Sequence, residues 1–470
     1  PRRTPSLESL PTAVPTLFDQ VPADVHYILQ RLRERGKRGW VVGGCVRDLL
    51  RGLPPKDWDV ATDATPQEVQ QMFAKVIETG MQHGTVTVLV EQRPYEVTTL
   101  RGESAYSDGR RPDRVEFVND IQADLARRDF TCNAIALDPL SAQVIDPFGG
   151  QRDLDAGILR AVGDPYERFA EDGLRVLRAA RFHAALGARI EENTERAMGD
   201  ARSHATFRKV SPERIREEWQ KTMLANQPSL AFETMLRTGI LGIISPEMVE
   251  SVGCTQNRYH AYDVWGHAMA CLDACEKDPL LRMAALLHDI GKPRTRAFSD
   301  KTNDYTFYEH EAVGAEMADP LLARLKFSNH ERERIVALVR HHLLCYTTDW
   351  SDSAVRRWLR RVGTDLAPDL YRLGRADARG KGLPTEDDIA RIAELEARAA
   401  RILAAGSALS VRDLAINGRD LLQLGMTPGP TMGNLLAALL ELVLDDPERN
   451  TRETLLAEAR QRIPRPSADS

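Results

Sequence analysis

The chain has 470 residues, enough for two to four domains at about 100–200 residues each. Its 42% hydrophobic and 28% charged residues exclude a disordered or fibrous chain. The net charge of −6 argues against non-specific coating of nucleic acid, and no run of about 18 apolar residues predicts a membrane span.

The N-terminal segment and the cysteines point to one compartment. The first 22 residues hold five prolines and no unbroken apolar stretch, which predicts a loose tail rather than a signal peptide. The six cysteines contain no C-x-x-C pair, so the sequence favours neither a disulfide framework nor a zinc ribbon. We therefore expect a cytoplasmic protein.

The spacing of apolar residues divides the chain into a mixed part and a helical part. Strand-type runs occupy 39–42, 59–62, 85–90 and 95–100, a hairpin is expected from 133–137 and 144–146, and 68–73 predicts a short helix. From about residue 165 onward, apolar residues recur every three or four positions, which predicts helices almost throughout. The fold class is therefore α+β, with a small mixed head on a long helical body.

Two features of the head predict phosphate and metal chemistry. The strand 39–42 ends in Gly43-Gly44 and enters a helix, so backbone N–H groups and Arg47 could reach a phosphate. A tight structural turn is the alternative for this segment. Asp57 and Asp59, two apart on a strand, point to the same side, where two Mg²⁺ ions would offset their repulsion. Unpaired surface acids are the alternative there.

Five ordered motifs resemble one family. They are Gly43–Asp48, Lys56–Asp59, Ala126–Asn133, Asp146–Leu154 and Glu171–Phe182. They resemble the class II tRNA nucleotidyltransferase and bacterial poly(A) polymerase superfamily, and the likeness covers about residues 25–455. It implies a polymerase-β-like nucleotidyltransferase head, with tRNA, CTP and ATP as partners and pyrophosphate as the leaving group.

The resemblance also implies roles for single residues in the head. Asp57 and Asp59 would be catalytic and would hold the Mg²⁺ ions. Glu96, on a neighbouring strand, is a possible third carboxylate, although a lone strand Glu is more often a surface residue. The residues expected to bind the nucleotide are Gly44, Arg47 and Arg128 at the triphosphate and Asp129 at the ribose 2′-hydroxyl.

One helix carries the residues expected to select the base. Asp172, Arg175, Arg178 and Arg181 recur every three residues and share a helix face. A stack of ordinary salt bridges is the plain interpretation. Alternatively, a carboxylate and a guanidinium can accept cytosine and adenine while rejecting uracil and guanine. The resemblance assigns that selection to Asp172 and Arg175, and phosphate or base contacts to Arg178 and Arg181.

Two further segments bear on nucleic acid. The polar loop between Arg101 and Ala126 corresponds to one that the resembling enzymes need for the switch from CTP to ATP, which argues against a C-only enzyme. The arginines at 356, 357, 360 and 361 recur on one helix side and could meet phosphates. A solvated helix face explains them equally well.

Histidines and aspartates form a second constellation further along the chain. The set His267, His288-Asp289 and Asp377 supplies a complete mononuclear metal site, and His310 and His341 are possible further ligands. This spacing resembles the HD phosphohydrolase superfamily, whose members hydrolyse phosphoesters with metal assistance. It implies a divalent transition metal of unknown identity, and a degenerate structural domain is the alternative.

Together these observations predict an enzyme with five parts. They are a flexible N-terminal tail (1–24), a nucleotidyltransferase head (25–150), a helical neck and body with the selecting motif (151–250), an HD phosphohydrolase domain (251–380) and a C-terminal helical tail that binds tRNA (381–470). The expected activity is addition of C, C and then A to the tRNA 3′ end. The alternatives are an A-adding enzyme, a poly(A) polymerase, or an HD hydrolase with a nucleotide-sensing head.

Overall fold

The computed structural model describes residues 17–81, 84–102 and 117–463. They form two compact units, one of residues 17–222 and 230–243, the other of residues 223–229 and 244–463. None of the helices in these ranges combines the length and apolar character of a membrane span. Residues 1–16 of the expected tail and 103–116 of the expected loop lie outside the described residues.

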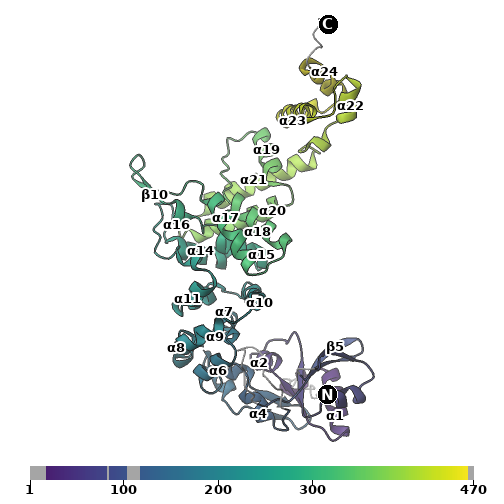
Figure 1. The fold of residues 1–470 in the computed structure, drawn as a ribbon, viewed down its shortest axis with the longest axis vertical. Coiled ribbons are helices and arrows are strands. Elements are labelled where there is room, and N and C mark those ends of the chain that lie inside the picture. Colours follow the sequence, from purple (N-terminus) through teal and green to yellow (C-terminus); the bar gives the residue numbers. More distant parts are fainter. Residues whose placement is uncertain (1–16, 82–83, 103–116, 464–470) are drawn as a thin grey trace, which may run out of the picture. The chain divides into compact units, whose positions relative to one another are not determined.

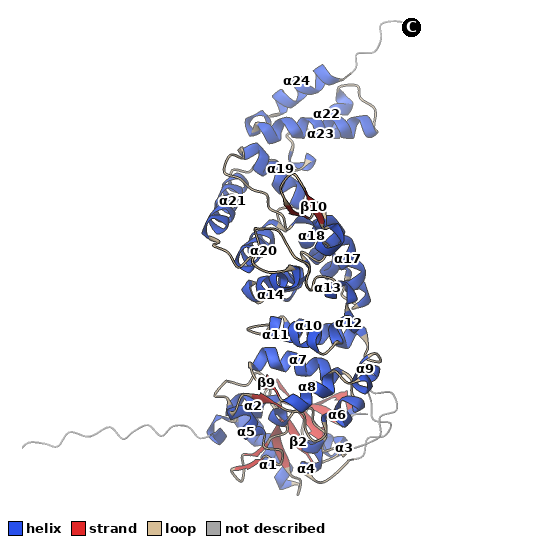
Figure 2. Ribbon diagram, turned by 90° about the vertical axis from the view of Figure 1, so that its left-hand side faces the viewer, coloured by secondary structure: helices blue, strands red, loops and turns tan. Residues whose placement is uncertain are grey.

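A seven-stranded sheet is the centre of the first unit (Figures 1 and 2). Its strands are β1 Gly39–Val42, β2 Asp59–Thr62, β3 Val76–Gly80, β4 Thr85–Val90, β5 Arg93–Thr99, β6 Ala136–Asp138 and β7 Gln143–Ile145. They lie in the order β3-β4-β5-β2-β1-β6-β7, with β2 and β5 parallel and the other neighbours antiparallel. The expected strands are confirmed, and β3 is an addition that the sequence did not predict.

Helices surround this sheet and continue beyond it. They are α1 Ala23–Glu34, α2 Gly44–Leu50, α3 Pro66–Met72, α4 Ile121–Ala126, α5 Gly150–Asp155, α6 Pro165–Glu171, α7 Leu174–Leu186, α8 Glu192–Met198, α9 Ala201–Phe207, α10 Pro212–Thr222, α11 Ser229–Arg237 and α12 Ile240–Ile244. Two 3₁₀ helices, η1 Leu17–Gln20 and η3 Thr131–Asn133, and the short parallel strands β8 Ile158–Leu159 and β9 Arg189–Ile190 complete this part. The tail was expected to extend to residue 24, but residues 17–20 form η1 and residues 23 and 24 begin α1.

Both faces of the sheet are buried. On one face the apolar side of α1, with Ile28 and Leu29, packs against a core that includes Val60 and Val97. On the other face Trp40 packs with Leu125 of α4 and its neighbours. Burial on both faces fixes the register of the strands, because a one-residue slip would turn each apolar side chain to the wrong face.

The second unit is helical apart from one hairpin. Its helices are α13 Pro246–Val249, α14 Val264–Ala274, α15 Pro279–Leu287, α16 Lys292–Thr295, α17 His310–Arg324, α18 Asn329–His341, α19 Asp352–Val362, α20 Ala367–Gly380, α21 Glu386–Ala404, α22 Gly418–Gln423, α23 Pro430–Asp445 and α24 Arg452–Arg462, with 3₁₀ helices η4 Val411–Asp413 and η5 Pro447–Arg449. The hairpin joins β10 Ala297–Ser299 and β11 Asp304–Thr306. The three strands after residue 165 among the described residues, β9 to β11, are two or three residues long, too short for a periodic signal.

The arginine-rich helix α19 is used inside this unit. Arg356 is buried, and its Nε donates to the carbonyl oxygen of Leu444 over 2.6 Å. Arg357 pairs with Glu441 and Asp445 of α23 at 3.1 and 2.7 Å. These contacts join α19 to the C-terminal helices, so both arginines have partners within this unit, Arg356 buried and Arg357 exposed.

Candidate active sites

A glycine turn starts the first site. Gly43 has a φ of +82°, a conformation that favours glycine, and it directly precedes α2. A Cβ atom there would lie 3.2 Å from Nη1 of Arg128 and 3.5 Å from Oδ2 of Asp59. The turn therefore brings bare backbone close to both side chains. Gly43 and Gly44 line a cavity of about 490 Å³ in the first unit.

Two of the carboxylates expected at the metal site line this cavity. Asp59, the first residue of β2, pairs in register with Glu96 on the parallel strand β5, and both line the cavity. Asp57 lies just before β2 and is exposed. Burial raises the pKa of Asp59, Glu96 and Asp57 raise it further, and Arg128 opposes them. Neighbouring carboxylates that disfavour each other's charge are suitable oxygen ligands for a divalent cation.

Asp129 is a buried residue of the same cavity lining, and both of its carboxylate oxygens accept hydrogen bonds. Its Oδ2 accepts from Arg178 over 2.6 Å, and its Oδ1 accepts from the Phe130 backbone N–H and from Asn133. Burial alone would raise the pKa of Asp129, but Arg178 and Asn133 lower it to about 2. Asn133 also accepts a hydrogen bond from Arg47, so Arg47, Asn133, Asp129 and Arg178 form one connected polar network in the cavity lining.

The two residues expected to select the base have separate partners. Asp172 accepts from the Leu174 backbone N–H and pairs with Arg214 of α10 at 2.7 Å. Arg175 pairs with Glu171 at 2.6 Å and donates to the carbonyl oxygen of Arg127. Asp172 and Arg175 both line the cavity. Each is therefore fixed toward the cavity by a different neighbour.

Arg178 and Arg181 differ in position although they share a helix face. Arg178 lines the cavity, whereas Arg181 is not among its lining residues. Arg181 pairs with the buried Glu218 at 2.5 Å and lies over the ring of Phe182. Arg181 is thus held by Glu218 and Phe182 outside the cavity lining. Sequence reasoning missed Arg214 and Glu218, because only the folded chain brings α10 beside α7.

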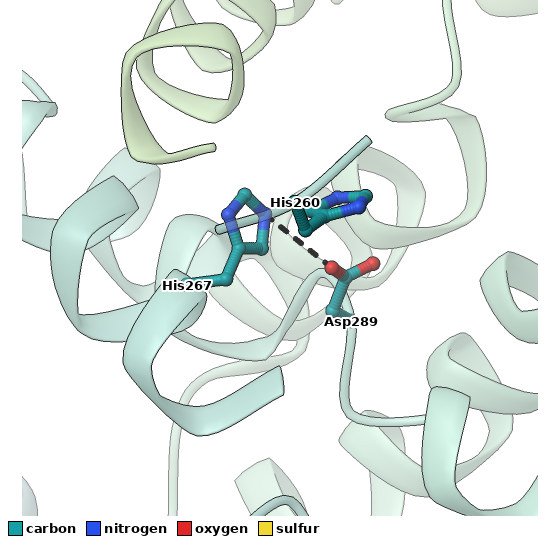
Figure 3. Close-up of side chains that lie close together, drawn as sticks. All are labelled: His260, His267 and Asp289. Atoms are coloured by element: carbon teal, nitrogen blue, oxygen red, sulfur yellow. Dashed lines mark ion pairs between the residues drawn. The ribbon is translucent and has the colours of Figure 1, made fainter. Parts of the chain in front are cut away.

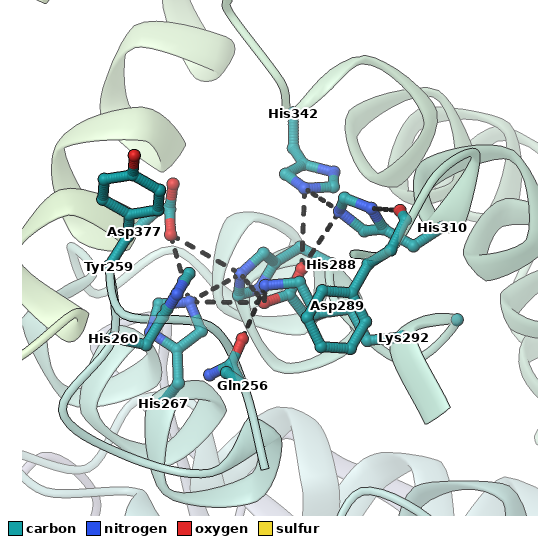
Figure 4. Close-up of polar contacts among 12 residues, drawn as sticks. Gln256, Tyr259, His260, His267, His288, Asp289, Lys292, His310, His342 and Asp377 are labelled. Atoms are coloured by element: carbon teal, nitrogen blue, oxygen red, sulfur yellow. Dashed lines mark hydrogen bonds and ion pairs between the residues drawn. The ribbon is translucent and has the colours of Figure 1, made fainter. Parts of the chain in front are cut away.

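The histidines and aspartates of the second unit meet around Asp289 (Figures 3 and 4). Its Oδ2 lies 3.4 Å from Nε2 of His267 and 3.2 Å from Nε2 of His288. Its Oδ1 faces the other way, 3.4 Å from Nε2 of His310 and 3.7 Å from that of His342. One carboxylate therefore serves two groups of nitrogen atoms.

Asp377 completes the first of these groups. Its Oδ1 lies 3.0 Å from Nε2 of His267 and 3.8 Å from Nε2 of His288. The two Nε2 atoms are themselves 3.1 Å apart. Three lone-pair atoms so close to one another repel unless a proton or a cation lies among them.

Three of the histidines are oriented in the same way. Nδ1 of His288 contacts the carbonyl oxygen of Ala285 at 2.8 Å, and the same contact joins His310 to Phe307 and His342 to Val339 at 2.7 Å each. A proton held on Nδ1 by a carbonyl leaves Nε2 as the free lone pair. In each case the partner lies three residues earlier, so the local backbone sets the tautomer.

The donor set fits a divalent metal. Neither oxygen of Asp289, nor Nδ1 of His267, has a hydrogen-bond partner of good geometry among the described residues, although all three atoms are buried. Lys292 forms an ion pair with Asp289 at 2.6 Å and donates to Gln256. Burial would raise the pKa of Asp289, but His288 and Lys292 hold it well below its usual range. Imidazole nitrogens with carboxylate oxygens suit a transition metal.

One expected ligand is corrected and one neighbour is new. The side chain that meets His310 is His342, with 3.3 Å between their Nε2 atoms, whereas His341 belongs to none of the clusters. His260 was not predicted, and it lies with His267 and Asp289 in a third possible ligand group. These side chains open into a cavity of about 350 Å³, whose walls include Lys292, Lys381 and Tyr308.

Family models divide the chain into three matched regions. Residues 39–160 match the poly A polymerase head domain, 187–251 the probable RNA and SrmB-binding site of polymerase A, and 258–398 the HD domain. The fold and the two sites therefore define a nucleotidyltransferase with an HD domain, and nucleotidyltransferases of this class use a divalent metal.

Full-length relatives narrow the class. The chain is 34% identical to the CCA-adding enzyme of Lactiplantibacillus plantarum over 451 residues, which cover 94% of this chain and 98% of that one. It is 35% identical to the CCA-adding enzyme of Lactobacillus delbrueckii subsp. bulgaricus over 91% of this chain and 95% of that one. The chain belongs to the CCA-adding enzyme family.

A solved structure shows the same fold. The crystal structure of the Bacillus stearothermophilus CCA-adding enzyme in complex with CTP is similar, with a TM-score of 0.70 and 27% identity. The match covers 93% of this chain and 96% of that one. The expected α+β fold, with a small mixed sheet followed by a helical body, is thereby confirmed.

Proposed function

We propose that this chain is a tRNA nucleotidyltransferase that adds C, C and then A to the tRNA 3′ end from CTP and ATP without a nucleic-acid template. One observation carries the proposal. A single cavity is lined both by Asp59 and Glu96 and by Asp172 and Arg175. The first pair fits phosphoryl chemistry, and the second pair fits recognition of a base.

The carboxylates are assigned to the reacting phosphate. Asp57, Asp59 and Glu96 hold divalent ions, expected to be Mg²⁺ because hard oxygen ligands surround them. When bound, such ions favour ionisation of the attacking 3′-hydroxyl and offset charge on the departing pyrophosphate. Burial raises the pKa of Asp59, and the neighbouring Glu96 and Asp57 carboxylates raise it further; a bound cation would offset both effects, which supports this assignment.

The turn and the arginines are assigned to the triphosphate. Gly44 offers its backbone at the start of α2, and the guanidinium groups of Arg47 and Arg128 lie along the same cavity. Asp129 is assigned to the ribose 2′-hydroxyl, as the sequence predicted. Its carboxylate already accepts from Arg178, so it is ionised and rigidly placed for that contact.

The base is selected by Asp172 and Arg175, with Arg178 nearby. The carboxylate of Asp172 accepts from the exocyclic amine that cytosine and adenine share, and Arg175 donates to a ring nitrogen or carbonyl. Arg214 and Glu171 hold these two groups in place. Arg181 of α7 pairs with Glu218 of α10 and supports the position of α7 without contacting the base.

The relatives favour this function over the alternatives. They are named CCA-adding enzymes, and the Bacillus stearothermophilus enzyme was solved with CTP. A head that only senses a nucleotide has no need of paired carboxylates such as Asp59 and Glu96. An A-adding enzyme and a poly(A) polymerase keep the same head chemistry, so the substrate assay distinguishes them.

The test uses three tRNA substrates that lack CCA, CA or A, with labelled CTP and ATP. We expect addition to all three, with C incorporated only where C is missing. Incorporation of A alone, and only on tRNA that already ends in CC, would indicate an A-adding enzyme. Unlimited A addition would indicate a poly(A) polymerase.

For the second unit we propose a metal-dependent phosphohydrolase. His267, His288, Asp289 and Asp377 would hold one divalent transition metal, and Asp289, His310 and His342 a second. When bound, such a metal supplies an activated water and an acceptor for phosphate charge. Lys292 and Lys381, on the cavity wall, are placed to attract a phosphate.

This second activity is tested separately from the first. The double variant His288→Ala/Asp289→Ala is compared with the wild type for phosphatase and phosphodiesterase activity across Mg²⁺, Mn²⁺, Co²⁺ and Ni²⁺. We expect hydrolysis to be lost and nucleotide addition to persist. Hydrolysis that survives the double substitution unchanged would contradict the assignment, as would a wild type that is inactive with every metal.

The domain limits and the location follow as parts of the same proposal. We retain a head at 25–150 and a neck and body at 151–250, followed by an HD domain and a tRNA-binding tail. The HD family model extends to residue 398, and Arg375 of α20 pairs with Glu396 of α21, which supports moving the boundary between the HD domain and the tail from residue 380 to about residue 398. All six cysteines are free, which supports a cytoplasmic location.

A further inference from the structure

A buried carboxylate lies behind the lining of the cavity in the first unit. Asp124 of α4 is 1% exposed and is not one of the residues that line the cavity. Burial would raise the pKa of Asp124, but Arg127 and Arg128 lower it below its usual value. Asp124 is therefore an ionised group next to the cavity, and the functions proposed above do not use it.

The partners of Asp124 are groups of the cavity lining. Its Oδ1 accepts from Nη2 of Arg127 over 2.5 Å and from the Arg101 backbone N–H over 3.2 Å. Its Oδ2 accepts from Nη2 of Arg128 over 3.2 Å. Arg101, Arg127 and Arg128 all line the cavity. One carboxylate thus fixes two neighbouring guanidinium groups, three and four residues further along the chain.

Arg128 lies near a second carboxylate but is not paired with it. A Cβ atom on Gly43 would lie 3.2 Å from Nη1 of Arg128 and 3.5 Å from Oδ2 of Asp59, so both side chains reach the same turn. In the described part of the chain, Arg128 forms an ion pair with Asp124 and none with Asp59. Its Nη1 donates to the carbonyl oxygen of Asn133 over 3.4 Å.

Two carboxylates are therefore placed to compete for one guanidinium. Asp59 is only partly buried, and its carboxylate is assigned above to a divalent ion. A guanidinium paired with Asp59 would cancel the charge that attracts the ion and would be lost to the triphosphate. Nε of Arg128 is buried and has no hydrogen-bond partner among the described residues, so this guanidinium keeps a donor for a ligand.

We propose that Asp124 is a positioning residue for nucleotide addition, and that it holds Arg128 away from Asp59. The inference rests on the function and the metal site proposed above for the head. Asp124 keeps the guanidinium of Arg128 at the triphosphate, and Asp59 stays open to the divalent ion. Asp124 itself contacts neither the nucleotide nor the ion.

The experiment replaces Asp124 in the full chain with asparagine, which keeps the size of the side chain and removes its charge. Asp124→Asn should raise the Mg²⁺ concentration for half-maximal CTP incorporation at least about fivefold, because Arg128 then pairs with Asp59. In an Arg128→Gln background the same substitution should leave the Mg²⁺ requirement unchanged, because the competing guanidinium is absent. An equal rise in both backgrounds would indicate a merely structural role and overturn the proposal.

A crystal structure of Asp124→Asn without metal gives a measurement that does not depend on activity. The guanidinium of Arg128 should lie within about 4 Å of the Asp59 carboxylate in the variant. An Arg128 side chain that keeps its wild-type position would refute the proposal. If Asp124→Asn does not fold, Asp124→Ser takes its place, because a serine hydroxyl also lacks the charge and is smaller, and the same rise is expected.

Asp120→Asn is the matched control. Asp120 is an exposed carboxylate at the N-cap of the same helix, where its side chain accepts from the Gln122 backbone N–H and where asparagine caps equally well. The control should keep the wild-type Mg²⁺ requirement, and a rise as large as in Asp124→Asn would contradict the proposal. If the wild type adds no nucleotide, the function proposed for the head fails, and the crystal structure alone decides the role of Asp124.

Discussion

Gly291 lies so close to Gly314 that a Cβ atom on Gly291 would come within 2.6 Å of the Gly314 nitrogen and 2.3 Å of the His310 carbonyl oxygen. Gly291 follows His288-Asp289 by two residues, and His310 begins α17. The contact therefore sets the distance between the two halves of the HD site. A side chain at this position would separate the ligands on either side of Asp289.

Gly291→Ala should consequently destabilise the second unit by about 1–3 kcal/mol, the usual cost of overpacking, and weaken metal binding there. Thermal unfolding and metal analysis measure the two effects. Gly242→Ala is the control, because a Cβ on Gly242 of α12 meets nothing within 4 Å. That variant should unfold at the wild-type temperature or slightly above it. Equal stability of the two variants would contradict the close contact.

Adjacent histidines provide a matched pair of variants. His342→Gln should lower the metal content and the hydrolytic rate, because its Nε2 lies 3.7 Å from Oδ1 of Asp289. His341→Gln should change neither, since His341 belongs to no ligand group among the described residues. Metal analysis after reconstitution with Mn²⁺ or Ni²⁺ and a phosphodiesterase assay give the answer. Loss of metal in His341→Gln but not in His342→Gln would identify His341 as the ligand, as the sequence predicted.

The head carboxylates should be indispensable for nucleotide addition. Asp59→Asn should reduce the rate at least about 100-fold, because removal of a metal ligand withdraws much of the electrostatic stabilisation of the transition state. Glu96→Gln should also reduce it, since Glu96 pairs in register with Asp59. The control is Glu91→Gln, as the Glu91 side chain is 76% exposed at the tip between β4 and β5. A Glu96→Gln variant with the wild-type rate would show that Glu96 is not a metal ligand.

Base selection should depend on the partner of Asp172 as well as on Asp172. Asp172→Ala and Arg214→Ala should both raise incorporation of UTP and GTP relative to CTP and ATP, because Arg214 holds the Asp172 carboxylate at 2.7 Å. Competition between the four nucleotides at equal concentration measures this ratio. Arg202→Ala, a change in an exposed arginine outside the cavity, should leave it unaltered. Variants that lose CTP and ATP use without accepting other bases would indicate a purely structural pair.

Asp129 should make stability depend on pH. Its folded-state pKa of about 2 lies below the unfolded value near 3.9, so the carboxylate stabilises the folded state above pH 4 and loses that effect as the pH falls toward 2. Asp129→Asn should therefore lower the free energy of unfolding by about 2 kcal/mol at pH 7, and the difference should shrink between pH 4 and 2. Urea unfolding at several pH values tests this. A difference that stays constant down to pH 2 would show that hydrogen bonds, not ionisation, are responsible.

The sequence predicted the strands β1, β2 and β4 closely, because each is a run of apolar or β-branched residues next to turn residues. It missed β3, an edge strand whose residues are mostly exposed, so no alternation of buried side chains marks it. Short strands such as β10 owe their existence to a hairpin partner rather than to their own composition.

The sites were predictable in part. Residues close in sequence, such as Asp57 with Asp59 or His288 with Asp289, were found from their spacing. The choice between His341 and His342 was not accessible, because neighbouring side chains on a helix point about 100° apart and only the packing of α18 decides which one faces Asp289. Arg214 and Glu218 were missed for a related reason, since both come from the separate helix α10, Arg214 to Asp172 at the cavity and Glu218 to Arg181.

The parallel pairing of β2 with β5 places a strict limit on how this head can change. Asp59 and Glu96 share one position of the register, and side chains alternate between the two faces of a sheet. An insertion in the turn between β4 and β5 would lengthen a surface connection at little cost, whereas one added residue inside β5 ahead of Glu96 would turn this carboxylate to the opposite face. A one-residue insertion is therefore tolerated in the turn between β4 and β5, whereas the same insertion within β5 would abolish the pairing of Glu96 with Asp59.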